Sequence, residues 1–158
     1  LGAAADHVLL MTYEWGYTYS EPRAVAPVNL VRRVIEYGIT EIPSGKIDMG
    51  IPNYGYDWLL PYEKGVTKAR TIGNVEAVRI ANDYGAVIEY DELAQTPHFS
   101  YVNESGTAHE VWFEDVRSIQ AKLGLIEEYN LRGAGYWQIM RLFRAGWLQL
   151  AQMYGINR

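Results

Sequence analysis

The chain of 158 residues contains no cysteine, which excludes disulfide bonds, thiolate zinc sites and cysteine nucleophiles. Basic residues are also few, because 14 Lys and Arg stand against 19 Asp and Glu and give a formal net charge of −5. Such a chain lacks the basic stripe that displaces counterions from phosphates, which argues against a nucleic-acid partner. No uninterrupted apolar run approaches the roughly 20 residues of a membrane-spanning helix.

Tyrosine and tryptophan are abundant instead: the chain has 13 Tyr and 5 Trp but only 3 Phe. Aromatic side chains with a polar group suit surfaces that are half apolar and half hydrogen-bonding. Apolar residues make up 49% and charged residues 21%, which excludes intrinsic disorder. The length predicts one domain, residues 1–158. Because the chain starts without Met and without a signal peptide, we expect it to be part of a longer polypeptide.

The hydrophobic pattern predicts alternating strands and helices. We expect core strands at residues 7–13, 47–52 and 133–139, and helices at 28–37, 74–84, 114–129 and 145–154. Gly38 and Gly85 are placed to end the first two helices, and Asn74 to cap the second. Residues 86–90 and 99–113 are predicted to be extended, with a hairpin turn at 103–106. A long aromatic loop is expected after the second core strand, with Tyr54, Tyr56, Trp58 and Tyr62.

This order predicts an α/β fold with parallel core strands joined by right-handed crossovers. A small β insertion, at about residues 86–113, precedes the last crossover helix. Three core strands leave two unpaired edges, and a complete eight-stranded barrel needs about 250 residues. The length and strand count therefore correspond to somewhat less than half of a (β/α)8 TIM barrel.

Several motifs resemble glycoside hydrolase family 18, the chitinase family, in the correct order and spacing. They are Asp6 to Trp15, Gly50 to Tyr56, Tyr90-Asp91-Glu92 through Phe99, Val111 to Asp115 with Ser118 and Lys122, and Gly133 to Trp137. The resemblance assigns the core strands to barrel strands 6–8 and leaves strands 1–5 upstream. With Glu14 in place of the family's usual Asp, the chain is most similar to the bacterial spore-coat and cortex branch. Those proteins are N-acetylglucosaminidases acting on peptidoglycan.

The resemblance implies a retaining mechanism without a carboxylate nucleophile. The N-acetyl oxygen of the substrate attacks the anomeric carbon, while a Glu at the end of the fourth strand protonates the leaving oxygen. That Glu closes an Asp-x-x-Asp-x-Asp-x-Glu motif, and no such pattern exists in these 158 residues. The expected function is thus that of part of a hydrolase for β-1,4 glycans containing N-acetylglucosamine, either peptidoglycan or chitin-type. We expect this part to be inactive alone.

The same resemblance implies the roles of the site residues. Tyr13 would orient the acetamido group, Met11 would pack under the sugar, and the Trp137 indole would form the floor of the −1 subsite. Glu14 would stand near the acetamido group or the catalytic Glu, although one extra methylene displaces its carboxylate. Further candidates for glycan contacts are Trp15, Asn53, Tyr54, Tyr56 and Trp58, in loops after strand ends, where barrels build their sites.

Structural interpretations stand beside these roles. Met11 and Tyr13 alternate along a buried strand and could belong to the barrel core. Trp137 could serve packing alone, and the aromatic loop residues could pack against neighbouring loops.

Asp91 and Glu92 point to opposite faces of a strand and cannot easily share a substrate. Glu114 and Asp115 open a helix, where acidic groups complement the dipole. The three histidines lack metal-ligand spacing, and neither a metal nor a cofactor is expected.

Two other hypotheses remain open at this stage. A glycan-binding module of the same fold would keep the aromatic platform without the acid. The exposed edges would also lead the chain to self-associate or to pair with the missing N-terminal half of the barrel. The resemblance alone places the protein in the spore or cell envelope of a bacterium.

Overall fold

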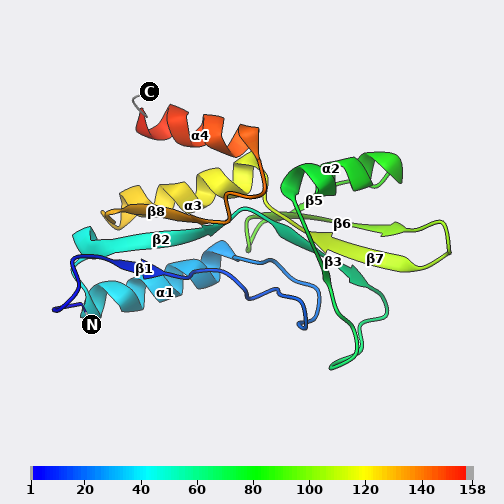
Figure 1. The fold of residues 1–158 in the computed structure, drawn as a ribbon, viewed down its shortest axis with the longest axis horizontal. Coiled ribbons are helices and arrows are strands. Elements are labelled where there is room, and N and C mark those ends of the chain that lie inside the picture. The colour runs from blue at the N-terminus through cyan, green and yellow to red at the C-terminus, as the bar shows by residue number, and fades with distance from the viewer. Residues whose placement is uncertain (1, 156–158) are drawn as a thin grey trace.

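The computed structural model describes residues 2–155 and shows two sheets that follow one another along the long axis of the molecule (Figure 1). One sheet is parallel, with the order β1-β2-β8, and the other is antiparallel, with the order β4-β3-β7-β6-β5. The parallel strands are β1 Val8–Leu10, β2 Ile47–Pro52 and β8 Gly133–Trp137. The antiparallel strands are β3 Gly55–Leu59, β4 Arg70–Ile72, β5 Glu89–Asp91, β6 Thr96–Val102 and β7 Ala108–Trp112.

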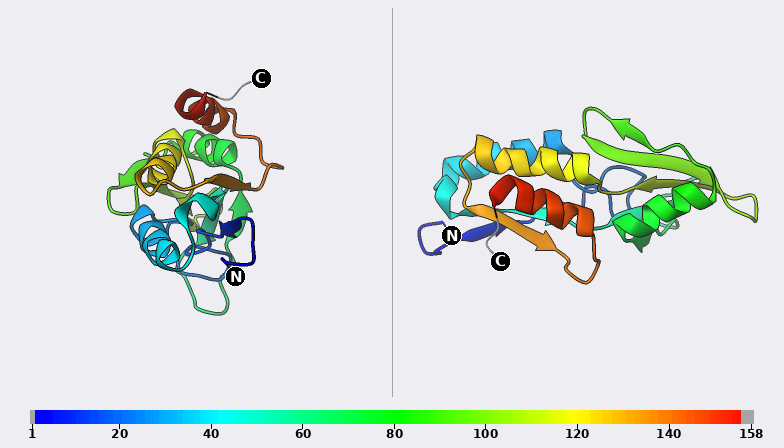
Figure 2. Two further views of the ribbon diagram at one scale, coloured as in Figure 1. Left: turned by 90° about the vertical axis from the view of Figure 1, so that its left-hand side faces the viewer. Right: turned by 90° about the horizontal axis from the view of Figure 1, so that it is seen from above.

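The parallel sheet has one face covered by helices. Ile47, Met49 and Ile51 of β2 pack against α1 Val28–Glu41 and α3 Val116–Glu128, and all three are fully buried. Figure 2 shows both helices along the same side of the sheet, while α4 Arg144–Tyr154 lies beside α3. Side chains alternate along a strand, so Gly50 and its β8 partner Gly135 belong to the opposite face, which no helix of residues 2–155 covers. The sequence correctly predicted these three strands and these helices, although β1 and β8 are shorter than expected.

Helix α1 continues past Gly38, so the prediction that Gly38 ends it is wrong. Gly38 is buried inside the helix, and a Cβ atom there would lie 3.1 Å from Leu10 Cδ1. The glycine therefore allows the helix to approach β1 closely and does not serve as a C-cap.

The predicted aromatic loop after β2 is also wrong at its centre. Residues 55–59 form β3, which pairs with β4 and β7, so the β structure begins well before residue 86. Tyr56 and Trp58 lie on one face of β3, while Asp57 lies on the other, where α2 Asn74–Asp83 covers the sheet. The hairpin between β6 and β7 turns at residues 103–106, as predicted.

The helix that starts at Asn74 is capped differently from the prediction. Gly73 occupies the N-cap position, and the Asn74 side chain binds elsewhere. Gly85 follows α2 with φ of +62°, a left-handed conformation that suits glycine, and this confirms it at the helix end. Helix α3 has a capping box, in which Asp115 accepts a hydrogen bond from the Ser118 N–H. None of the helices in residues 2–155 has the length and apolar character needed to cross a bilayer.

Candidate functional site

A hollow of about 240 Å³ opens where the two sheets meet, beyond the carboxyl ends of β1 and β8. The parallel strands end on the side of the molecule where the antiparallel sheet begins (Figure 1). The hollow is lined by Tyr13, Glu14, Tyr54, Tyr56, Thr71, Trp137 and Gln138. It therefore unites residues from β3, β4 and β8 with residues from the segments that follow β1, β2 and β8. The sequence predicted five of these seven residues as site residues.

The Glu14 carboxylate is fixed by two phenol groups. The hydroxyls of Tyr54 and Tyr56 both donate to Glu14 Oε1, the second at 3.0 Å, and the two rings meet edge to face. Glu14 itself has φ of +71°, a conformation that non-glycine residues seldom adopt. Burial, and then the hydrogen bond to Glu14, raises the pKa of Tyr54 far above its usual range. The two phenols therefore stay protonated, and Glu14 remains a hydrogen-bond acceptor at the edge of the hollow.

Tyr13 is half-buried beside Glu14, with its ring against Gly50. A Cβ atom at position 50 would lie 2.7 Å from Tyr13 Cε1, so the ring needs glycine there. Burial, and secondly the charge of Glu14, raises the pKa of Tyr13. Its phenol therefore stays protonated at neutral pH and can donate a hydrogen bond to a ligand.

Trp137 and Met11 are exposed at this end of the open face. The fractional exposure of Trp137 is 55% and that of Met11 is 73%, so neither side chain packs into the core formed by residues 2–155. Trp137 lines the hollow together with the acidic and phenolic groups. An exposed indole beside several fixed polar groups is suited to a ligand with an apolar face and a hydroxylated rim, such as a pyranose.

Residues 1–141 match the sequence pattern of the glycosyl hydrolases family 18. The chain belongs to glycoside hydrolase family 18. This confirms the resemblance seen in the motifs. The chain is similar to the cortical fragment-lytic enzyme of Bacillus subtilis, with 50% identity over 98% of the chain and 36% of the relative. It is also similar to the corresponding Bacillus anthracis enzyme, with 41% identity over 99% of the chain and 36% of the relative.

Solved structures show the same relationship. The spore cortex-lytic enzyme SleL of Bacillus cereus aligns with a TM-score of 0.93 and 42% identity, over 96% of this chain and 35% of that one. SleL of Bacillus megaterium aligns with a TM-score of 0.89 and 48% identity, over 93% and 33%. The mixed α/β fold is thus that of the carboxyl-terminal part of family 18 proteins. The chain spans about a third of the length of these relatives.

Trp58 and Trp15 do not line the hollow, although both were predicted to contact glycan. Trp58 has no exposed surface, and its indole N–H donates to the Ser20 carbonyl at 2.7 Å. It packs with Tyr56 and Val25, so the prediction of a direct glycan contact is wrong for Trp58. Trp15 lies in a separate groove against α1, beside Leu30 and Tyr37.

Asn53 is likewise buried, with 3% exposure, and the predicted direct glycan contact is wrong for it as well. Tyr54 and Tyr56 are nearly as buried but still reach the hollow through their hydroxyls. Their rings have almost no exposed surface for stacking on a sugar, and the Tyr56 ring also contacts both Tyr54 and Trp58. What the structure shows of both side chains is that their hydroxyls bind the Glu14 carboxylate.

Thr71 and Gln138 are the two lining residues that sequence reasoning missed. Thr71 reaches the hollow because β4 pairs with β3 and sets Thr71 opposite Tyr56. Gln138 follows Trp137 in the loop after β8. Neither residue type carries a sequence signal for glycan binding, and long-range strand pairing is not visible in local periodicity.

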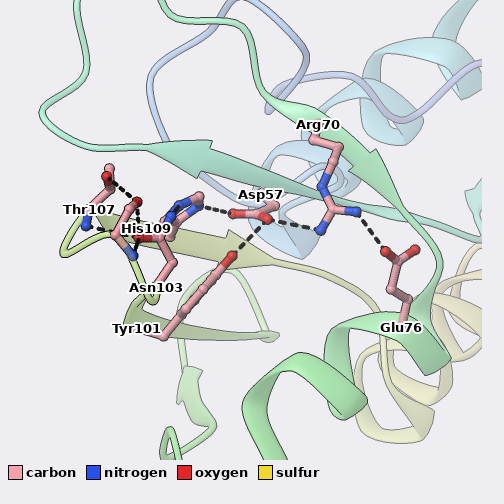
Figure 3. A network of polar contacts seen from close by, with 8 residues as sticks. Asp57, Arg70, Glu76, Tyr101, Asn103, Thr107 and His109 are labelled. Atoms are coloured by element: carbon pink, nitrogen blue, oxygen red, sulfur yellow. Dashed lines mark hydrogen bonds and ion pairs between the residues drawn. The ribbon is translucent and has the colours of Figure 1, made fainter. Parts of the chain in front are cut away.

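A second polar cluster lies on the other face of β3 and centres on the buried Asp57 (Figure 3). Asp57 accepts hydrogen bonds from Tyr101 at 3.0 Å and from Arg70 at 3.2 Å, and it binds His109 Nδ1 at 2.8 Å. The Asn103 amide oxygen is occupied by loop N–H groups, so its amide nitrogen donates to His109 Nε2. Both nitrogens of His109 are therefore engaged inside the hairpin, and the cluster stabilises the antiparallel sheet.

Glu114 was expected to support the helix dipole, but it forms a fully buried ion pair instead. Its Oε2 accepts from Lys122 Nζ at 2.8 Å and from the Ser118 hydroxyl at 2.5 Å. Burial raises the pKa of Glu114, while the Lys122 charge opposes that shift. In the described part of the chain, no group of three or more His, Asp and Glu side chains is arranged to hold a metal ion.

Proposed function

We propose that this chain supplies the sugar-positioning half of the active site of a glycosidase acting on β-1,4 glycans that contain N-acetylglucosamine. One observation carries the proposal: Glu14, held by Tyr54 and Tyr56, lines one hollow together with Tyr13 and the exposed indole of Trp137. The similarity to cortical fragment-lytic and spore cortex-lytic enzymes supports cortex peptidoglycan as the substrate and the spore envelope as the location. Chitin-type glycans share the same acetamido group.

The reaction that we propose is retaining and substrate-assisted. The N-acetyl oxygen attacks the anomeric carbon, the glycosidic bond breaks, and a general acid protonates the leaving oxygen. Tyr13 donates a hydrogen bond that orients the acetamido group, and Glu14 accepts one from the bound sugar or from the acid. Trp137 supports the apolar face of the ring. The general acid comes from another segment, since no residue here belongs to an Asp-x-x-Asp-x-Asp-x-Glu motif.

The three parallel strands and their helices form, in this proposal, strands 6–8 of a (β/α)8 barrel. The bare face of the sheet then becomes part of the barrel interior, and the free edges of β1 and β8 pair with the remaining strands. The chain alone is then inactive, and it binds the rest of the barrel or a second copy of itself through this face.

A Trp137→Ala substitution in the full-length polypeptide tests the function. We expect kcat/KM on cortex fragments to fall roughly a hundredfold, because the ring that positions the substrate is lost. The variant should keep its fold, and its far-UV circular dichroism spectrum checks this. Ile139→Ala is a matched control, because Ile139 is an exposed apolar residue two positions further on that does not line the hollow.

Near-normal turnover of Trp137→Ala would contradict the assignment of Trp137. If the unaltered full-length protein bound cortex fragments but released no new reducing ends, and Trp137→Ala abolished that binding, the protein would be the glycan-binding alternative.

A further inference from the structure

The loop after β8, which carries the wall of the hollow, is held by a buried side chain from the neighbouring strand. Asn53 follows β2 directly, and its amide nitrogen Nδ2 donates to the Arg141 carbonyl at 2.5 Å and to the Gln138 carbonyl at 3.4 Å. Its backbone N–H donates to the Trp137 carbonyl at 2.8 Å. One residue thus binds three carbonyls of the segment 137–141.

The orientation of this amide is determined by groups further inside the protein. The Asn53 oxygen Oδ1 accepts from Asn74 Nδ2 at 3.4 Å, and Asn74 Oδ1 accepts from the backbone N–H of Glu114 at 3.0 Å. Carbonyl oxygens at one end and an N–H group at the other leave each amide a single orientation that satisfies both of its contacts. Asn53 and Asn74 are both almost fully buried, so water does not compete with these bonds.

We call this series of hydrogen bonds, from the segment 137–141 through Asn53 and Asn74 to Glu114, the amide relay. Its inner end is rigid, because Glu114, just before α3, is ion-paired with the buried Lys122. The outer end has a second attachment, since the Arg141 guanidinium donates to the Thr71 carbonyl at 3.4 Å. Thr71 itself lines the hollow. The segment 137–141 is therefore anchored to β2, α2, β4 and the start of α3.

We infer that Asn53, supported by Asn74, is a positioning residue that sets the place of the Trp137 ring in the substrate site. The residues contact no ligand in this role and act through the loop. The effect on turnover rests on the proposed function, whereas the effect on the position of Trp137 does not. Displacement of a binding group by about 1 Å can lower activity a hundredfold. Hydrogen bonds that fix the position of Trp137 can therefore affect turnover strongly, even when each bond is weak.

The test is Asn53→Asp in the full-length polypeptide labelled with 5-fluorotryptophan. The substitution keeps the size and the acceptor for Asn74 but turns a carboxylate oxygen toward the carbonyls of Gln138 and Arg141. We expect the fluorine resonance of Trp137, assigned by its loss in Trp137→Phe, to shift and broaden. We also expect kcat/KM to fall by roughly a hundredfold. Asn74→Asp, which weakens the relay one step further away, should move the same resonance less.

Asn103→Asp is the matched control, because it makes the same change in the β6–β7 hairpin, where Asn103 binds His109. The Trp137 resonance should stay in place there, and kcat/KM should remain within about twofold, as expected for a distant site. An unmoved Trp137 resonance in Asn53→Asp would overturn the inference, as would an equal shift in Asn103→Asp. If Asn53→Asp does not fold, Asn53→Ala removes the donor without adding a charge, and the same outcomes apply.

The two proposals can fail separately. If Trp137→Ala leaves turnover intact while Asn53→Asp moves the Trp137 resonance, the relay stands and the assigned function is wrong. If Trp137→Ala abolishes turnover while the resonance is unmoved in Asn53→Asp, the function stands and the relay is wrong.

Discussion

A tryptophan at the end of the parallel sheet is exposed, whereas one in the antiparallel sheet is buried. Trp137, at the end of β8, is 55% exposed and forms a wall of the hollow, whereas Trp58, in β3, has no exposed surface and holds a loop through its N–H. The two residues look equivalent in the sequence, since each lies in an aromatic-rich segment near glycine. The difference lies in the sheets: β8 faces an uncovered side, while β3 has strands on both edges and packed layers on both faces.

The acidic groups of the two regions also differ in how completely other side chains satisfy their hydrogen bonds. The antiparallel region satisfies Asp57 internally through Tyr101, Arg70 and His109. At the end of the parallel sheet, Glu14 is exposed, and among residues 2–155 its carboxylate is held by two phenol groups. A saturated cluster stabilises the fold, and a partly open one is available to a ligand. Function is therefore expected at the boundary between the regions and not inside the antiparallel sheet.

The largest expected consequence concerns association of the isolated chain. Leu9, Met11 and Trp137 are exposed on the bare side of the parallel sheet, next to the free edges of β1 and β8. We expect sedimentation velocity to show self-association, and Met11→Gln to weaken it. Leu93→Gln, which changes an equally exposed residue in the turn after β5, should not. A monodisperse 18.0 kDa monomer would contradict the expectation.

The next effect is on stability and compares the two tryptophans directly. In the 158-residue chain itself, where these exposures apply, Trp58→Ala should lower the free energy of unfolding by about 3–5 kcal/mol, because it empties a packed site. Trp137→Ala should change it by no more than about 0.5 kcal/mol, as for surface positions. Urea unfolding curves of both variants provide the measurement. Equal losses would show that the two regions are not packed differently.

The smallest effect appears at alkaline pH. Burial raises the pKa of Tyr54, Tyr56 and Tyr101 above the ordinary value of 10.0, and that of Tyr136 to about 12. Above pH 10 the unfolded chain ionises its tyrosines while these stay protonated, so the unfolded state binds fewer protons and stability falls as the pH rises. A buried tyrosine contributes a slope of about 1.4 kcal/mol per pH unit.

Tyr54→Phe checks this assignment, because it removes one of the groups with a raised pKa. The variant should lose stability less steeply than the unaltered protein between about pH 10 and 11.5, measured by urea unfolding at each pH. Parallel slopes in the two proteins would mean that Tyr54 ionises as readily in the folded state as in the unfolded one.

The sequence was most informative for segments whose secondary structure follows from their own hydrophobic pattern. The apolar strands at residues 47–52 and 133–137 and the amphipathic helices α1 and α3 follow from local periodicity. Tyr13, Glu14 and Trp137 were identified because family motifs mark the ends of these strands. Prediction failed where the outcome depends on pairing with a distant segment. Strand β3 looked like a loop because one of its partners, β7, is far away in the sequence, as the pair Tyr56 and Trp112 shows.

The amino-acid sequence by itself determined the family, the order of strands and helices, and the types of side chain at the site. Only the tertiary structure decided which aromatic residues are available to a ligand. It buried Trp58 and Asn53 as supports, left Trp137 exposed, and joined Glu14 to two phenols some 40 residues further along the chain. The physical reason is that burial and hydrogen bonding depend on which surfaces the packed sheets cover, and periodicity within one segment carries no record of its distant neighbours.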